Sequence, residues 1–168
     1  MNFNISNLEL PHNSTRSVFN SSEMNSVIQL FNDLHSESTN HEINATYRKC
    51  SSILLGGKIL GSFNSRSTNT SIIFAELYEE DRPAKIKYFA KVSVVVDGIL
   101  KIHVLASLQW FNNHPQKNIC GKPVTVWESD VFHLCNFLPV HCIKSRSISL
   151  VDKLDDTYGD VLFVSPYE

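Results

Sequence analysis

The segment Ile86–Phe111, IKYFAKVSVVVDGILKIHVLASLQWF, decides the fold. It consists of two apolar runs on either side of Asp97-Gly98. Asp and Gly tolerate the positive φ angles of a two-residue turn, so this dipeptide predicts a tight β-hairpin. Such a turn places Val96 opposite Ile99 and fixes the register of both strands.

The predicted register places Tyr88 opposite Ser107, and it places Trp110 on the face that carries Lys85 and Phe89. Tyr88 and Trp110 therefore fall on opposite faces, unless a bulge or a longer turn shifts the pairing. Both faces carry apolar groups. That pattern is typical of strands in a small barrel that are covered on both faces over part of their length.

Further short strands surround this hairpin, separated by turn residues, and together they predict a barrel or a sandwich. The segment Glu128–Cys135 is compatible with a helical turn or a bulged strand, and Pro83 is expected to exclude a central strand from the charged turn at 79–83. The other predicted strands are 46–50, 51–55, 71–78, 124–127, 137–144, 147–151 and 161–165.

The amino-terminal part of the chain is rich in Asn and Ser. Residues 1–20 show no hydrophobic period, so we expect them to be loosely ordered. Residues 21–44 are predicted to form an amphipathic helix and a linker, with Ser22 as the cap. The apolar face of that helix consists of Met24, Val27, Ile28, Phe31 and Leu34. The β domain is expected to span residues 45–168.

The 168-residue chain has a formal net charge of −2, so no global basic field favours nucleic acid or membranes. Its first residues lack the basic and apolar regions of an export signal, and no apolar run is long enough to span a membrane. We therefore expect an intracellular protein that does not act on membranes, with reduced cysteines.

Several motifs in the second half resemble, in their order, the bromo-adjacent homology (BAH) domain. They are Tyr88-Phe89-Ala90, Leu108–Phe111 with Pro115, Glu128–Phe132, and Leu138-Pro139-Val140 with Ile143. The longer pattern, with Gly61, Ser62, Ser65 and Gly121–Trp127, also looks like that of proteins from mobile-element-rich invertebrate and fungal genomes. The predicted fold class is therefore a mainly β protein, a distorted BAH-like β-barrel with one amino-terminal helix.

The resemblance implies a non-enzymatic module that binds a protein or peptide, such as a histone tail, in nuclear chromatin. Some members of the family hold a methylated lysine in an aromatic cage. By position, Tyr88 and Trp110 are the cage candidates, with Trp127 and Asp130 as further peptide contacts. A purely structural role for these aromatic residues is the alternative.

The rival hypothesis is a nucleic-acid-binding accessory protein of a mobile element. Lys85, Lys87, Phe89 and Lys91 would form a basic and aromatic strand face of the kind that holds single strands. A solvated lysine face that protects the strand from edge pairing is the simpler explanation.

The sequence predicts neither a cofactor nor a catalytic constellation. Five potential zinc ligands cluster late in the chain, but their spacing is not that of paired zinc ligands, and adjacent strand residues point to opposite faces. Of these residues only His133 and Cys135 could share a face. No metal site is therefore predicted for them. The five are Cys120, His133, Cys135, His141 and Cys142.

Overall fold

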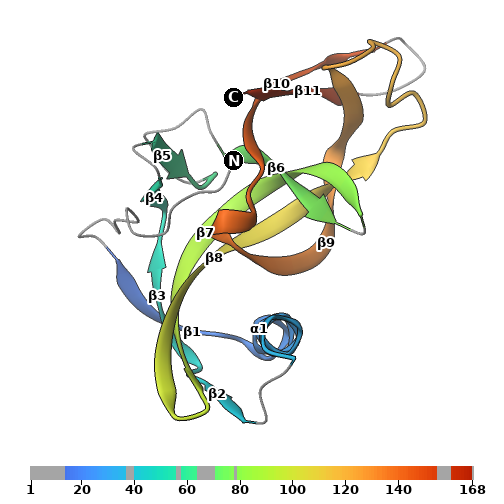
Figure 1. Ribbon diagram of the computed structural model, residues 1–168. Helices are drawn as coiled ribbons and strands as arrows, with labels where there is room; N and C mark the ends of the chain where they lie inside the picture. Colours follow the sequence, from blue (N-terminus) through green and yellow to red (C-terminus); the bar gives the residue numbers. More distant parts are fainter. Residues whose placement is uncertain are drawn as a thin grey trace.

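The computed structural model describes residues 14–36, 40–55, 58–63, 71–77, 79–154 and 160–167. This part is mainly β-strand, with one α-helix near its start, which confirms the predicted class (Figure 1). The α-helix is not long and apolar enough to cross a membrane, and the described residues contain no other candidate span. The elements are β1 (Thr15–Val18), α1 (Ser21–Leu34), β2 (His41–Ile43), β3 (Thr46–Cys50), β4 (Ser52–Leu55), β5 (Lys58–Gly61), β6 (Ile72–Leu77), β7 (Glu80–Val96), β8 (Ile99–Asn113), β9 (Thr125–Pro139), the 3-10 helix η2 (Val140–Cys142), β10 (Ser145–Lys153) and β11 (Asp160–Tyr167).

The predicted hairpin is formed by β7 and β8, and it runs through much of the molecule (Figure 1). Asp97 and Gly98 have φ angles of 50° and 79°, as the two-residue turn requires. Val96 pairs with Ile99, and Tyr88 pairs with Ser107. The register predicted from the turn is therefore confirmed over this part of the hairpin.

A β-bulge interrupts this register at Lys87, which has no paired residue on β8. Ile86 pairs with Leu108, and Trp110 pairs with Ala84 rather than with Lys85 as the unbroken register predicts. Side chains alternate between the two faces of a strand. One inserted residue therefore exchanges the faces on which the side chains before it lie, compared with an unbroken register. The bulge thus buries Ala84 and leaves Lys85 on the opposite face.

Both faces of the hairpin are buried against a core, as predicted. The first core contains Phe89 and Trp110 and packs against the β4–β5 hairpin. The second contains Tyr88 and lies under α1, whose buried residues are Val27 and Phe31. Tyr88 and Trp110 therefore belong to opposite faces, even though a bulge is present.

The strand pairings return to their starting point. From β7 they pass through β6, β10, β11, β9 and β8, and β8 pairs again with β7. The β4–β5 hairpin forms a separate two-stranded sheet. A third core, around Phe111, Trp127 and Leu162, lies where β6, β8, β9 and β11 meet.

The other edge of β7 pairs with three strands in succession. β6 pairs with it over 80–85, β3 over 89–91 and β2 over 94–96. The bulge therefore falls in the gap between β6 and β3. At this gap the Ile86 N–H donates to the Ser71 carbonyl, and the Ile86 carbonyl accepts from the Phe63 N–H, each at 2.8 Å.

Pro83 lies inside β7, so the turn predicted at 79–83 was wrong, although the exclusion of a central strand at Pro83 is confirmed. Pro83 pairs with Phe74 of β6, whereas the pairing of β7 with β8 begins only at Ala84. β7 is thus paired on one side at this position. A proline without an N–H is tolerated where the strand has a free edge.

Three other sequence predictions differ from the structure. Asn20 rather than Ser22 caps α1. The segment expected to be loosely ordered contains β1, which pairs with β3, although residues 1–13 lie outside the described part. β9 (Thr125–Pro139) is one long strand where separate strands were predicted at 124–127 and 137–144, and its irregular pairing with β8 matches the bulged alternative for Glu128–Cys135.

The hairpin turn gives a test of the fold. A Cβ built at Gly98 meets no atom within 4 Å, so Gly98→Ala adds no clash and retains only the backbone strain of a positive φ. We expect Gly98→Ala to lower the free energy of unfolding by about 1–2 kcal/mol in urea denaturation. Asp97→Asn, which keeps a residue suited to positive φ, is the matched control. An equally stable Gly98→Ala variant would contradict the assigned turn.

Candidate functional site

A pocket of about 560 Å³ lies beside the bulge in β7. Lys85, Lys87 and Tyr88 of β7 line it together with Gln109, which pairs with Lys85 across the hairpin. Further walls come from β1, the first turn of α1, the end of β3 and the segment after β5. The pocket therefore lies where the partner of β7 changes from β6 to β3.

Three lysines line this pocket, hereafter the lysine pocket: Lys49, Lys85 and Lys87. The Lys49 ammonium lies 4.3 Å from the centre of the Tyr88 ring, and that of Lys85 lies 3.3 Å from the centre of the Phe63 ring. Within the described part of the chain, none of the three forms an ion pair with a carboxylate. Partial burial lowers the pKa of Lys85, since burial penalises the charged ammonium.

Glu23 is the acidic residue among the described residues of the pocket wall, and its carboxylate accepts hydrogen bonds from two donors. The Tyr88 hydroxyl donates to one oxygen at 2.6 Å, and the Asn20 N–H donates to the other at 3.0 Å. The second contact belongs to the capping box of α1. Burial, followed by hydrogen bonding to Glu23, raises the pKa of Tyr88, so this phenol stays neutral and fixes the start of α1 against β7.

Two small polar side chains complete the wall. Cys50 is buried at the end of β3, and its thiol donates to the Phe89 carbonyl at 3.8 Å. Burial raises the pKa of this thiol to about 11. Ser62 is also buried, and its Oγ has no hydrogen-bond partner among the described residues.

The predicted peptide-binding residues do not come together in the structure. Tyr88 lines the pocket, whereas Trp110 is buried in the core on the other face of the hairpin. Trp127 is also buried, and the cationic groups of Arg82 and Lys117 lie 5.3 and 4.1 Å from its ring centre. The ring of Trp127 thus already contacts cations of its own chain.

Asp130 is exposed on β9 and does not line the pocket. Of the predicted nucleic-acid contacts, Lys85 and Lys87 line the pocket. Phe89 is fully buried in the first core, so its ring is not available to stack on a base. Lys91 is half-buried and lies outside the pocket.

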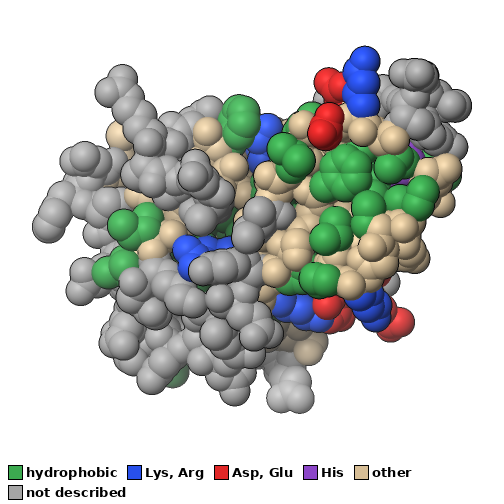
Figure 2. Space-filling model, turned by 90° about the horizontal axis from the view of Figure 1, so that it is seen from above, with side chains coloured by type: hydrophobic (Ala, Val, Ile, Leu, Met, Phe, Trp, Pro, Cys, Tyr) green, Lys and Arg blue, Asp and Glu red, His purple; other side chains and the backbone are tan. Residues whose placement is uncertain are grey.

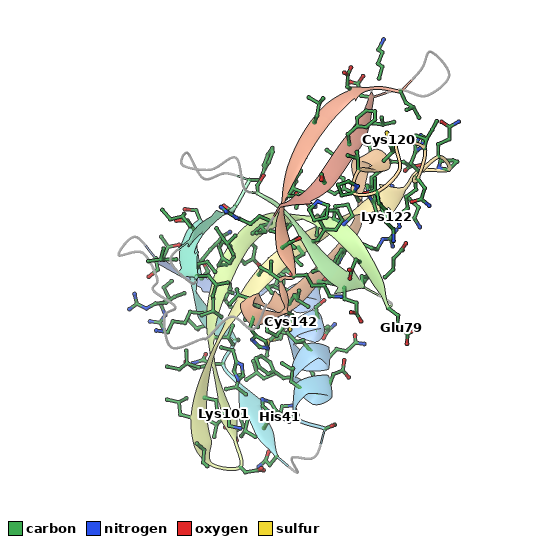
Figure 3. All side chains as sticks on the ribbon, turned by 45° about the horizontal axis from the view of Figure 1, so that its top comes forward. His41, Glu79, Lys101, Cys120, Lys122 and Cys142 are labelled. Atoms are coloured by element: carbon green, nitrogen blue, oxygen red, sulfur yellow. The ribbon has the colours of Figure 1, made fainter. Side chains whose placement is uncertain are left out.

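The candidate zinc ligands do not form a described cluster. No group of three or more His, Cys, Asp or Glu residues that could hold a metal is present among the residues described. Cys120 and Cys142 lie in different parts of the molecule (Figure 3). The side chains of His133 and Cys135 lie outside the described part, and His141 is exposed.

Two other histidines meet next to α1. The rings of His35 and His103 lie 5.7 Å apart, and both contact Phe31. Burial, followed by neighbouring positive charge, lowers the pKa of each, which favours the neutral imidazoles. This pair therefore belongs to the packing of α1 on the hairpin.

A second surface feature is apolar. Figure 2 shows hydrophobic side chains gathered on the face seen from above, and on this β10–β11 end Leu150 and Val151 are exposed. Neither residue lines the lysine pocket. These two exposed side chains of β10 therefore lie outside the pocket.

Sequence reasoning missed Glu23, Lys49, Cys50, Ser62 and Phe63 as pocket residues. They come from α1, from β3 and from the segment after β5, which approach β7 only in the folded chain. Lys49 lies in a correctly predicted strand, but nothing local marks it as a neighbour of Tyr88. A basic residue without a nearby acidic residue in its own strand is the one available signal, and it is weak.

Comparison with known proteins does not assign the chain to a family. No family model, curated protein or solved structure matches the chain. The BAH resemblance therefore stays a prediction.

The thiol in the pocket wall can be tested by alkylation. We expect iodoacetamide at pH 8 to modify exposed Cys120 at least about a hundredfold faster than Cys50, since few Cys50 thiols are ionised when the pKa is about 11. Peptide mass spectrometry measures both rates, and the urea-unfolded protein, in which they should converge, is the control. Equal rates in the folded protein would contradict the burial of Cys50.

Proposed function

We propose that the protein is a non-enzymatic binding module that takes an acidic segment of a partner protein in the lysine pocket. The observation that carries this proposal is that Lys49, Lys85 and Lys87 line one pocket without a described carboxylate partner. An acidic side chain in the pocket would accept charge-assisted hydrogen bonds from these ammonium groups.

The distribution of charge supports this choice of partner. The chain as a whole carries a net charge of −2, so attraction for an anion must come from a local patch. Some described cations outside the pocket have carboxylate partners, for example Lys144 with Glu76 and Asp81 at 2.8 and 2.5 Å. Lys49 and Lys85 differ from Lys144 because their ammonium groups lie over aromatic rings, and all three pocket lysines converge on one cavity.

The groups in the pocket favour binding over catalysis. A thiol whose pKa is about 11 is a weak nucleophile at neutral pH, and the described residues that line the pocket include no histidine to act as its base. Lysine, serine and glutamine side chains supply hydrogen-bond donors for a ligand. These features fit recognition of an anionic group.

The same pocket is poorly suited to a histone tail, since a basic peptide would meet three ammonium groups. A methyl-lysine cage would need Tyr88 and Trp110 on one face, but they lie in different cores. We therefore propose an acidic peptide rather than a histone tail as the partner. The nuclear, chromatin-associated setting implied by the BAH resemblance stays a prediction.

Nucleic acid is the second candidate, because Lys85 and Lys87 line the pocket and Phe63 is 60% exposed beside them. Phosphates would replace the carboxylates of an acidic peptide. Against it, Phe89 is buried, and the lysines converge on one pocket instead of following a strand-long track. The acidic peptide is the better fit.

We further propose that the closed circuit of pairings from β7 back to β7 forms a distorted barrel of the BAH kind. Support comes from the cores on both faces of the β7–β8 hairpin and from the bulges that bend β7 and β9. In such a barrel the lysine pocket lies at a break in the wall.

The proposal can be tested with two immobilised degenerate peptide libraries, one with a fixed Asp-Glu pair and one with a fixed Lys-Arg pair. We expect the Asp-Glu library to retain the protein and the Lys-Arg library not to retain it. Replacing Lys49, Lys85 and Lys87 together by Gln should reduce retention at least about tenfold, a loss of about 1.4 kcal/mol or more. Raising the salt from about 50 to about 500 mM should also weaken it.

The matched control replaces three exposed lysines elsewhere, Lys101, Lys122 and Lys153, by Gln and changes the net charge equally. It should bind like the unmodified protein, with circular dichroism showing that both triple variants are folded. Equal losses in the two variants, or no retention by the Asp-Glu library, would overturn the proposal. Tighter, salt-sensitive binding of a mixed-sequence DNA or RNA oligonucleotide would favour the second candidate.

A further inference from the structure

We propose that the group recognised in the lysine pocket is a phosphorylated side chain of the partner protein. This inference rests on the proposed function, since it specifies which acidic group the pocket selects. A phosphoserine or phosphothreonine carries a charge of about −1.5 to −2 at pH 7 and has three strong acceptor oxygens. A carboxylate has one charge and two oxygens.

The charge of the pocket matches a dianion. Lys49, Lys85 and Lys87 contribute three positive charges, and Glu23 contributes one negative charge, which leaves a formal charge of +2. The carboxylate of Glu23 accepts from the Tyr88 hydroxyl and the Asn20 N–H, and it forms no ion pair with the three lysines in the described structure. A single carboxylate would leave one of these charges without a partner.

The supply of donors also exceeds what a carboxylate can accept. Each lysine ammonium has three N–H donors, and those of Lys49 and Lys85 lie over aromatic rings. Ser62 adds a buried hydroxyl in the pocket wall that has no partner among the described residues. Buried polar groups are normally hydrogen-bonded, and a phosphoryl oxygen in the pocket would supply the partner that the Ser62 hydroxyl lacks among the described residues.

Lys85 supplies a further argument. Its ammonium is partly desolvated next to Phe63 and has no counter-ion in the described part of the chain. Withdrawing a cation from water without pairing it is unfavourable. A doubly charged ligand at this position would offset that cost better than a singly charged one.

A phosphomonoester fits the pocket better than the backbone of a nucleic acid. Each phosphodiester carries one negative charge and is spaced along a strand, whereas the charge of a monoester is concentrated on one group. The lysines converge on one pocket, and exposed Phe63 at its margin offers an apolar contact for residues next to the phosphorylated one. These features favour a single phosphomonoester group on a peptide side chain.

The test uses three immobilised degenerate peptide libraries that differ only at one fixed position: phosphoserine, Asp or Ser. At pH 7.5 we expect the phosphoserine library to retain the protein at least about tenfold better than the Asp library and the Ser library to retain none. Lowering the pH to about 5.5 should reduce this preference, since the second ionisation of the phosphoryl group lies near pH 6. Retention by the Asp library should change little over the same range, since that carboxyl stays ionised.

Variants show whether the pocket is responsible. Lys85→Gln and Lys87→Gln should each reduce the preference for phosphoserine over Asp by about fivefold or more, because each removes an ammonium donor. Lys101→Gln and Lys122→Gln, at exposed positions outside the pocket, should retain the full preference. Preference that survives in both pocket variants would overturn the assignment to this pocket.

Each outcome separates this inference from the function on which it rests. Equal retention by the phosphoserine and Asp libraries would overturn the phosphoryl assignment but leave acidic-peptide binding in place. Absence of retention by both would overturn both proposals. Tighter binding to vesicles containing a phosphoinositide, or to single-stranded DNA, than to the phosphoserine library would assign the pocket to a lipid headgroup or a nucleic acid and reject the phosphopeptide.

Discussion

The inserted residue Lys87 in β7 is the constraint on which the arrangement of this protein depends. Because side chains alternate along a strand, one extra residue lets Ala84, Ile86 and Phe89 all face the core that contains Trp110. Lys85 is thereby directed away from that core, on the side of Tyr88. The same position separates the stretch of β7 that pairs with β6 from the stretch that pairs with β3. The bulge, the gap between partners and the lysine pocket are consequences of one local departure from regular pairing.

The hairpin itself could be predicted from Asp97-Gly98, because the backbone geometry of a two-residue turn fixes the pairing of the residues next to it. The register therefore held as far as Tyr88 and Ser107 and failed beyond, since nothing in the local sequence marks Lys87 as the residue without a partner. The prediction of a turn rather than a strand at 79–83 failed for a related reason. Proline limits pairing on one side of a strand only, and the sequence does not show which edge is free. The pocket could not be predicted from the sequence, because it joins residues as distant in sequence as Glu23 and Gln109.

The account of function depends on charges that the fold brings together without pairing them. Several cations of this chain have carboxylate partners, as Lys117 and Arg82 have in Glu80. Lys49 and Lys85 contact rings instead, and Glu23, the one carboxylate among the described lining residues, is held by Tyr88 and the cap of α1. Ring faces attract ammonium groups but do not cancel their charge. The pocket is thus ordered by neutral partners while its cationic groups stay available to an anion, which suits a binding role.

The central claim is that an anion binds at the bulge rather than at basic residues in general. The most direct measurement is a titration of the isotope-labelled protein with phenyl phosphate, a minimal phosphomonoester, followed by amide NMR shifts. The account predicts saturable shifts concentrated at residues 49–51, 62–63 and 85–88, with little change at Lys101, Lys122 and Lys153. Shifts of similar size at all exposed lysines, or none at the pocket, would contradict it.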